Sequence, residues 1–431
     1  MTDYDVIVIG AGPAGSTVAT LVAQRGHRVL LLERGRFPRF HIGESLMPET
    51  YWTFKRLGLL PKLRNSNFVR KYSVQFINHS GKESQPFYFD ERNPHECSQT
   101  WQVLRSEFDR MMLENAAEQG VEVWQEANVT DILTEPAEND DLPRVTGVVV
   151  ESKKENRTSR ISARVVVDAT GTNALISRRF DIRRPDPMLR KCAIFAHYKG
   201  AYRDSGKDEG ATLVISTPDQ DGWFWYIPLP DDIVSIGVVG EVDQLVTSRQ
   251  SKEQTLDEEI ARCAPVARRL EKAQRVSPVH VLSDFSYRST RPAGEGWVLV
   301  GDAFGFLDPI YSSGVFLALK SGEMAADAIN EALAGNDLSA RQLGKWGEVL
   351  NDGMGAIRRL VYAFYTKGFS FGQFVRQHPM YKDNLVELLI GDVFRPEVNA
   401  IFTDMGRYVK IPQAIPLQSP GGPRRDVPVG V

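Results

Sequence analysis

The N-terminal residues constrain the fold of this chain more than any other stretch. An apolar run, Val6 to Ile9, predicts a buried strand that leads directly into a G-x-G-x-x-G motif and then into a helix. In this setting the first glycine allows a tight turn, the second lets a pyrophosphate approach the backbone, and the third lets the helix pack closely on the strand. Amides at the helix N-terminus face the phosphates. The predicted phosphate-binding residues are Gly10, Gly12, Pro13, Ala14 and Gly15.

A second predicted strand, Val29 to Leu32, ends at Glu33. A carboxylate roughly 20 residues past the glycines suits hydrogen bonds to an adenosine ribose. We therefore place Glu33 and its neighbour Arg34 at that end of the nucleotide. The motif predicts a dinucleotide in an α/β domain, but it does not separate NAD from FAD.

Three later stretches end in polar residues or glycines. A helix begins next to Arg105, a buried strand closes on Asp168 and Gly171, and another strand leads to a turn at Asp302 and a loop at Pro309. Taken singly, Asp302 fits a turn residue and Arg105 a surface charge. In this order after the glycine motif, the stretches resemble the FAD-binding fold of the p-hydroxybenzoate hydroxylase superfamily. The resemblance implies that these residues contact FAD, with Asp302 at the ribityl chain.

Because these stretches are distant in sequence, we expect an α/β fold with a discontinuous, Rossmann-like FAD-binding domain, an inserted β-sheet substrate domain and a C-terminal helical region. The expected segments are 1–72, 101–180 and 285–342 for the FAD domain, 73–100 and 181–284 for the substrate domain, 343–410 for the helical region and 411–431 for an irregular tail. Aromatic residues crowd the helical region, where we favour helix packing over a ligand site. The acidic stretch 137–144 is predicted to be a solvated hairpin tip.

The string WFWYIP, residues 223–228, predicts a strand with a wall of indole on one face. With a period of two, Trp223, Trp225 and Ile227 lie on one side and the intervening residues on the other. An isolated stripe of this kind fits a buried strand. On a flavin scaffold, however, the string matches W-x-W-x-I-P, and the chain resembles the flavin-dependent halogenases.

This resemblance implies a definite chemistry. FADH2 reacts with O2 to give a C4a-hydroperoxide, halide attacks its distal oxygen, and hypohalous acid passes through a tunnel to a substrate that Trp223 and Trp225 keep away from the flavin. The family also uses one lysine near the substrate, and the segment NFVRKYSVQF places Lys71 there. Burial lowers the pKa of a lysine and favours the neutral amine, which the guanidinium of Arg70 cannot match. The alternative is a surface lysine beside Arg70.

Two further segments resemble the family. GESLMP, which contains Ser45, matches a segment that runs along the flavin, and DPIYSSGV matches one whose amides hold chloride. We therefore assign Ser313 and Gly314 as halide contacts through their N–H groups, at a predicted helix start. Tyr311 stands where we expect phenylalanine. The chain looks most like bacterial halogenases of pyrroles and phenols, many of which act on substrates tethered to carrier proteins.

Composition limits the partners and the compartment. No second G-x-G-x-x-G follows a strand, so we expect a separate flavin reductase to supply FADH2. The net charge of −3 gives no reason to expect nucleic acid or an anionic membrane, and no apolar run approaches the roughly 20 residues that span a bilayer. The three cysteines fit neither a zinc site nor a disulfide framework. We therefore expect no metal site. Because the sequence also shows no signal-peptide pattern, we expect a cytoplasmic protein.

Three other functions share parts of these patterns. An aromatic hydroxylase would oxidise NAD(P)H by itself and need no halide. A geranylgeranyl-reductase-like flavin oxidoreductase would associate with membranes, and a non-catalytic flavoprotein would be indifferent to replacement of Lys71. We expect chlorination or bromination of an electron-rich aromatic or heteroaromatic substrate, because this function alone requires both the tryptophan wall and the lysine.

Overall fold

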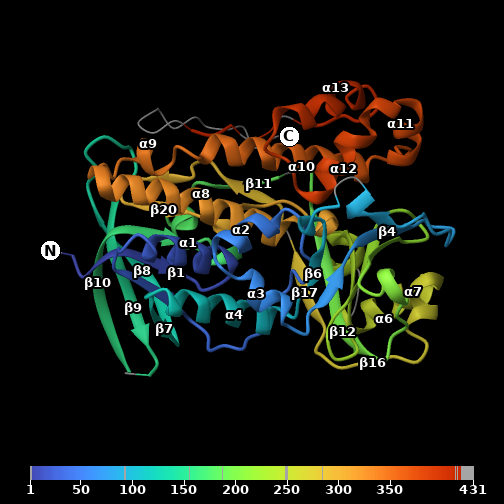
Figure 1. The fold of residues 1–431 in the computed structure, drawn as a ribbon, viewed down its shortest axis with the longest axis horizontal. Coiled ribbons are helices and arrows are strands. Elements are labelled where there is room, and N and C mark those ends of the chain that lie inside the picture. Colours follow the sequence, from blue (N-terminus) through green and yellow to red (C-terminus); the bar gives the residue numbers. More distant parts are fainter. Residues whose placement is uncertain are drawn as a thin grey trace.

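Two large sheets lie side by side, and helices from the end of the chain cover one side of the molecule (Figure 1). The structure is a computed structural model that describes residues 2–91, 94–154, 156–186, 188–247, 251–283, 285–412, 414 and 416–418. Most of the predicted irregular tail, 411–431, lies outside the described residues. The fold class is the expected α/β arrangement of a Rossmann-like sheet, a second sheet and C-terminal helices.

The first sheet contains the strand that precedes the glycine motif. Its parallel strands run in the order β20 (Trp297–Leu299), β10 (Arg157–Asp168), β1 (Tyr4–Ile9), β2 (Val29–Glu33) and β7 (Glu122–Gln125), with β19 (Ala293–Gly294) antiparallel at the edge. Residues 6–9 of β1 are buried, as the apolar run predicts for a central parallel strand. Helix α1 (Pro13–Ala23) contacts both α8 (Ser313–Gly335) and α4 (Arg105–Glu118), and so lies between them (Figure 1).

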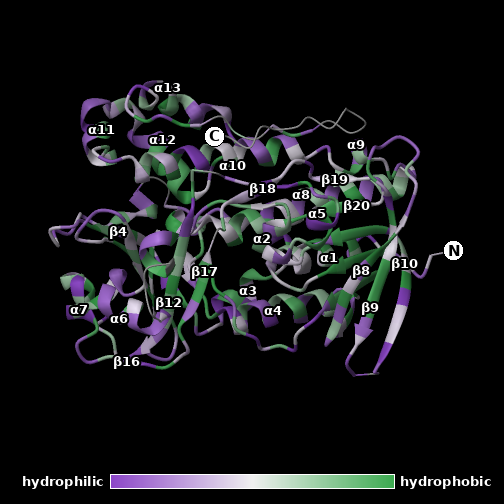
Figure 2. Ribbon diagram, turned by 180° about the vertical axis from the view of Figure 1, so that it is seen from behind, coloured by the Kyte–Doolittle hydropathy of each residue, from purple (hydrophilic) through white to green (hydrophobic). Residues whose placement is uncertain are grey.

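An antiparallel ribbon extends from this sheet. The first half of β10 pairs with β9 (Arg144–Ser152), which pairs with β8 (Ala127–Glu135). The start of β10 is largely exposed and hydrophilic (Figure 2).

The acidic stretch 137–144 joins β8 to β9, as predicted for a hairpin tip, and residues 138, 139, 141 and 143 are exposed, but the tip also holds a buried ion pair that its composition does not predict. Asp140 and Asp141 each lie 2.5 Å from a guanidinium nitrogen of Arg291, whose side chain is 1% exposed. A buried guanidinium requires carboxylate partners, and the sequence does not reveal that an arginine 150 positions away needs this loop.

The second sheet contains the tryptophan strand. Its order is β16 (Gln274–Arg275), β12 (Lys191–Lys199), β15 (Ile233–Glu241), β14 (Trp223–Pro228), β13 (Thr212–Ser216), β4 (Ser73–Ile77) and β5 (Phe87–Tyr88), with β17 (His280–Ser283) also paired to β12. Helices α6 (Lys252–Arg262) and α7 (Ala264–Arg269) accompany it. The strands thus come from the two segments that we assigned to the substrate domain, whose boundaries remain a prediction.

The two faces of β14 belong to two different apolar cores. Trp223, Trp225 and Ile227 pack into the large core that also contains the first sheet, whereas Phe224 and Tyr226 pack into a separate core. This agrees with the period-two prediction. Gly237 on β15 pairs with Trp225, and a Cβ there would lie 2.2 Å from the indole ring. The glycine therefore makes the space that the indole occupies.

The remaining α-helices and strands of the described chain lie outside the two large sheets. They are α2 (Thr50–Arg56), α3 (Leu60–Arg64), the β3 (Val69–Lys71) and β6 (Thr100–Gln102) ribbon, α5 (Leu175–Arg179), the β11 (Arg183–Pro185), β18 (Tyr287–Ser289) and β21 (Gly305–Phe306) sheet, α9 (Ala340–Leu343), α10 (Gly347–Tyr365), α11 (Phe371–Gln377), α12 (Lys382–Ile390) and α13 (Ile401–Met405). In the described part of the chain no helix combines the length and apolarity needed to cross a bilayer.

Candidate active site

A cavity of about 640 Å³ lies between the two sheets and brings most of the predicted site residues together. Those that line it are Gly10, Gly12, Pro13, Ala14, Glu33, Arg34, Ser45, Arg105, Gly171, Trp223, Trp225, Asp302, Pro309 and Gly314. Gly15, Lys71, Asp168 and Ser313 lie behind its wall. The cavity therefore joins the glycine motif, the tryptophan face and the start of α8 in one space.

Each of the three glycines of the motif is needed for a different structural reason. Gly10 has φ +101°, and a Cβ there would lie 2.4 Å from the carbonyl oxygen of Ala169. At Gly15 a Cβ would lie 1.9 Å from the carbonyl oxygen of Gly10, so the glycine permits the close helix–strand contact. At Gly12 a Cβ would meet no protein atom within 4 Å. Because Gly12 lines the cavity, its bare backbone is free to contact a pyrophosphate, which fits a dinucleotide cofactor.

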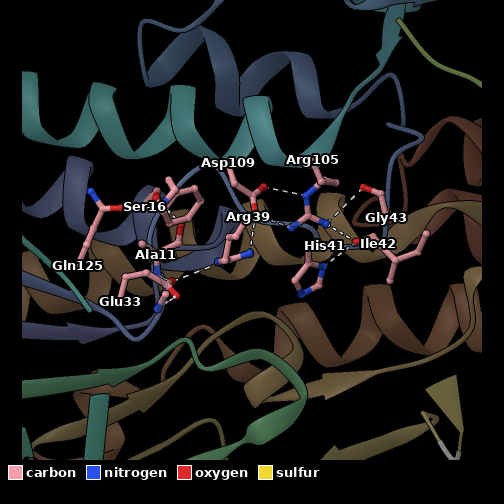
Figure 3. A network of polar contacts seen from close by, with 12 residues as sticks. Ala11, Ser16, Glu33, Arg39, His41, Ile42, Gly43, Arg105, Asp109 and Gln125 are labelled. Atoms are coloured by element: carbon pink, nitrogen blue, oxygen red, sulfur yellow. Dashed lines mark hydrogen bonds and ion pairs between the residues drawn. The ribbon is translucent and has the colours of Figure 1, made fainter. Parts of the chain in front are cut away.

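A chain of charged groups runs along this end of the cavity (Figure 3). Glu33 accepts a hydrogen bond from the amide of Ala11 at 3.1 Å and pairs with Arg39 at 3.3 Å. Arg39 also pairs with Asp109, which holds Arg105 at 2.7 Å. Arg105 is only 4% exposed and donates to the carbonyl oxygen of Ile42. It is therefore not a surface charge, and it ties the loop around Ile42 to the start of α4.

The two predicted aspartates differ in position. Asp302 lines the cavity, where burial raises its pKa to about 6 against the opposing effect of Arg105. Asp168 is fully buried and accepts hydrogen bonds from the amide and hydroxyl of Thr170 and from the amide of Ile176. Asp168 thus does not line the cavity, although the next three residues do, and its predicted contact with the cofactor stays a prediction. Its side chain fixes the loop that carries Gly171, because both carboxylate oxygens are used within that loop.

The start of α8 presents backbone to the cavity. Ser312 adopts the left-handed conformation with φ 56°, and Ser312 and Gly314 both line the cavity, whereas Ser313 is 1% exposed. Amides in the first turn of a helix stabilise an anion. Ser312 was missed because adjacent serines look alike in sequence and only the handedness of the turn distinguishes them. Tyr311 uses its hydroxyl to donate to the carbonyl oxygen of Leu360 at 3.1 Å.

Both wall tryptophans are fixed by hydrogen bonds. The indole N–H of Trp223 donates to the hydroxyl of Tyr365 at 2.9 Å, and that of Trp225 donates to Ser235 at 3.1 Å. Their rings are 1% and 5% exposed, with centroids 6.2 Å apart. Because each indole has a polar partner and lies in a packed environment, the wall is a rigid surface of the cavity.

Lys71 is buried rather than exposed beside Arg70. It is 2% exposed, and its Nζ donates to the hydroxyl of Ser45 at 2.8 Å and to the carbonyl oxygen of Leu46 at 3.1 Å. No ion pair to a carboxylate occurs at Lys71 among the described residues. Burial therefore lowers its pKa to about 7. Ser45 lines the cavity, so a single side chain separates this amine from it.

Sequence reasoning overlooked Glu44. Glu44 lines the cavity, and its buried carboxylate lies 2.6 Å from Nε2 of His197 and has a second oxygen with no hydrogen-bond partner in the described part of the chain. A buried carboxyl and imidazole at this distance can share or deliver a proton. The available signal was its place in the GESLMP segment next to Ser45.

Comparisons with known proteins extend over most of the chain. The profile of the tryptophan halogenase family matches residues 5–94 and 90–370. The chain is 31% identical over 412 residues to a 1H-pyrrole-2-carbonyl-(peptidyl-carrier protein) chlorinase of Pseudomonas fluorescens, covering 91% of this chain and 90% of the relative. It is 34% identical over 394 residues to the corresponding brominase of Pseudoalteromonas luteoviolacea, covering 91% and 92%.

Solved structures agree with these sequence comparisons. A flavin-dependent brominase superposes with a TM-score of 0.82 at 31% identity, covering 94% of this chain and 98% of that one. A myxobacterial chondrochloren halogenase superposes with a TM-score of 0.78 at 32% identity, covering 92% of each chain.

Proposed function

The chain belongs to the tryptophan halogenase family of flavin-dependent halogenases, and from this premise we propose which residues carry out its reaction. The enzyme uses FAD and chloride or bromide to halogenate aromatic or pyrrole substrates. Its family membership favours halogenation over the hydroxylase, reductase and non-catalytic alternatives.

We propose that FAD lies along the glycine motif with its reactive ring between Trp223, Trp225 and the start of α8. When bound, reduced FAD would give two electrons to O2, so that one oxygen atom leaves as water and the other oxidises halide to hypohalous acid. Glu33 and Arg34 face the ribose end, and Arg105 and Asp302 border the middle of the cavity. The tryptophans fill the space beside the ring and exclude an organic substrate, while the amides of Ser312 to Gly314 attract halide.

The observation that carries the proposal is the position of Lys71. Its amine is buried without a carboxylate partner among the described residues, and it donates to the hydroxyl of Ser45, a residue that lines the cavity. Among the described residues, Lys191 is the other buried lysine, at 5% exposure, and it forms an ion pair with Glu241. Lys71 differs from Lys191 in having no such partner, and burial lowers its pKa to about 7. We propose that it receives the hypohalous acid, by hydrogen bond or as a haloamine.

We further propose that the substrate is a pyrrole or phenol carried on a carrier protein. The named activities of the chlorinase and brominase relatives support this, since both act on a pyrrolyl group attached to a peptidyl carrier protein. A separate reductase would deliver FADH2, because the sequence shows no second dinucleotide motif. The three cysteines are buried and form no disulfide in the described chain, which supports a reducing cytoplasm.

The role of Lys71 is tested by Lys71→Ala, with Arg70→Ala as the matched control at an exposed neighbour. We expect Lys71→Ala to bind FAD and consume O2 like the wild type while product falls below about 1%, and Arg70→Ala to keep its product. Loss of bound FAD in Lys71→Ala, or full product, would refute the assignment.

The substrate class is tested separately with a wild-type panel. Pyrrole-2-carboxylate is offered free and as a thioester on a carrier protein, beside free phenols and indoles, with reduced FAD, O2 and bromide. We expect bromine isotope patterns in the carrier-bound pyrrole or phenol. Equal bromination of the free acids would contradict the requirement for a carrier.

A further inference from the structure

One hydrogen-bonded chain connects the tryptophan wall to the loop before α8 through a residue of the C-terminal helices. The indole N–H of Trp223 donates to the hydroxyl of Tyr365 at 2.9 Å, and that hydroxyl donates to Oδ2 of Asp308 at 3.0 Å. The other carboxylate oxygen of Asp308 accepts the amide of Ile310 at 2.9 Å. Three segments that are distant in sequence, namely β14, α10 and the loop at 308–312, thus meet at one phenol.

The surroundings of Tyr365 favour this arrangement. Burial raises the pKa of Tyr365 well above its usual value, so the phenol stays protonated and serves as the donor. Burial also raises the pKa of Asp308 to about 7, with Lys191 acting in the opposite direction. Nζ of Lys191 lies 4.2 Å from the centre of the Tyr365 ring. Phe364 packs edge-on against Trp223, with ring centroids 6.3 Å apart.

Helix α10 holds the same loop at a second point. The hydroxyl of Tyr311 donates to the carbonyl oxygen of Leu360 at 3.1 Å. The loop that presents Ser312 and Gly314 to the cavity is therefore attached to α10 at both ends, and through Tyr365 also to the wall. Our expectation that the aromatic cluster of this region only packs helices together does not account for this connection.

We propose that Tyr365 is a positioning residue for halogenation, whose hydroxyl holds the Trp223 indole and the halide-binding loop in one fixed relation. The proposal rests on the proposed function of that loop. Tyr365 does not line the cavity, so it acts through the two groups that it joins. When the connection is lost, wall and loop no longer hold halide against the site of oxidation. The two electrons of reduced FAD then leave with O2 and two protons as hydrogen peroxide.

The test is Tyr365→Phe, with Tyr362→Phe as the matched control. Tyr362 lies one turn earlier on α10, and its hydroxyl also donates to a carboxylate, that of the partly buried Asp186, at 2.6 Å. Each substitution removes one phenol hydroxyl from the same helix, but only Tyr365 connects to the wall. We expect both variants to bind FAD normally and to lower the melting temperature of the apoprotein by similar amounts.

The two variants should differ in coupling, meaning the brominated product formed per FADH2 oxidised, and in halide binding. For Tyr365→Phe we expect brominated product per FADH2 to fall about tenfold with a matching rise in hydrogen peroxide, and the bromide KM to rise about fivefold. Bromide titration followed by flavin absorbance should show the same weakening without turnover. Tyr362→Phe should stay within about twofold of wild type on both measures. Coupling of Tyr365→Phe within twofold of wild type, or an equal loss in both variants, would overturn the proposal.

Trp223→Phe covers the case in which Tyr365→Phe fails to fold, because it breaks the same chain at the other end. The double variant, Trp223→Phe with Tyr365→Phe, completes a double-mutant cycle. We expect its brominated product per FADH2 to be no lower than that of the more affected single variant. Additive losses would show that Tyr365 does not act through Trp223. A failure of the proposed role of Lys71 can be told apart from a failure of this proposal. Full product in Lys71→Ala would refute the role of the lysine but would not alter the expected rise in hydrogen peroxide in Tyr365→Phe.

Discussion

Lys71 is a buried lysine whose amine has no carboxylate partner in the described part of the chain. A lysine amine in an apolar interior normally has a carboxylate partner, as Lys191 has in Glu241. The Nζ of Lys71 donates only to neutral oxygens, those of Ser45 and Leu46. These acceptors keep the amine oriented but do not compensate a full positive charge. The folded protein therefore bears a desolvation cost whenever Lys71 is protonated.

This cost predicts that Lys71→Met stabilises the fold. Below pH 7 the amine is charged in both folded and unfolded chains, so the full cost is present, and it declines as pH rises from about 7 toward the ordinary lysine pKa of 10.5. We expect a gain on the order of 2–4 kcal/mol in unfolding free energy below pH 7, shrinking toward zero near pH 10. Denaturant titrations of both proteins at several pH values measure it. A destabilised variant, or a gain that grows with pH, would contradict a buried and uncompensated amine.

The same pKa predicts the pH dependence of halogen transfer. On the proposed haloamine route the neutral amine accepts the halogen, and its fraction rises with pH through about 7. Product formation in single turnovers should therefore increase about tenfold from pH 6 to pH 8, while the rate of flavin oxidation should not follow this profile. Rapid quenching at each pH, with the flavin absorbance as the internal control, provides the comparison. A profile that falls over this range would refute transfer through the neutral amine.

At the scale of elements, the strand–turn–helix unit at the N-terminus was predictable because its determinants are local. The close contact of Gly15 with Gly10 lies within the motif, and the positive φ of Gly10 is a property of the turn itself, although the contact of Gly10 with Ala169 is not local. The alternation of β14 was predictable for the same reason. The chain through Tyr365 was not, because it depends on how three distant segments meet, and Ser312 depends on a local handedness that two adjacent serines do not encode.

The different roles of the motif glycines give a paired prediction. Gly12→Ala adds a methyl group that meets no protein atom but enters the cavity, so we expect a melting temperature within about 2 °C of wild type and FAD affinity reduced at least tenfold. Gly15→Ala drives its methyl group against the carbonyl of Gly10, so the fold itself should be destabilised. Thermal melts of the apoproteins and FAD titrations separate the two effects. Equal behaviour of the two variants would contradict this assignment.

The loop at 137–144 gives a test of the buried ion pair between its aspartates and Arg291. Asp140→Ala leaves Arg291 buried with one of its two carboxylate partners, and we expect a loss of about 3 kcal/mol in unfolding free energy. Glu138→Ala, in the same acidic loop but exposed, should change stability by less than about 0.5 kcal/mol. Urea unfolding of both variants decides the point. Equal unfolding free energies of the two variants would show that the ion pair of Asp140 with Arg291 does not stabilise the fold.

For the whole molecule, the site depends on the second sheet lying against the first. The glycine motif, the wall and the start of α8 come from separate parts of the chain and line one cavity. Sequence analysis reached the fold class, and most of the residues that it predicted for the site line the cavity, because the family motifs contain them. It did not reach the shape of the cavity, the position of Lys71 behind Ser45, or the partnership of Glu44 with His197, which arise only when both sheets are assembled.

The absence of a second dinucleotide motif in the sequence predicts dependence on another protein. Purified enzyme with FAD, NADH, O2 and bromide should oxidise no NADH above background, and addition of a flavin reductase should start bromination. Chemically reduced FAD should replace the reductase. Oxidation of NADH by the enzyme alone would contradict the prediction and favour a hydroxylase-like cycle.

The central claim is that the halogen is oxidised in the cavity and then transferred through Lys71. The most direct measurement is a single turnover of wild type and Lys71→Ala with reduced FAD, O2, bromide and substrate, with free hypobromous acid trapped and product analysed by mass spectrometry. The account predicts undiminished hypobromous acid from Lys71→Ala and bromine in the product of the wild type alone. Oxygen insertion without a need for bromide, or bromination by Lys71→Ala at the wild-type level, would contradict it.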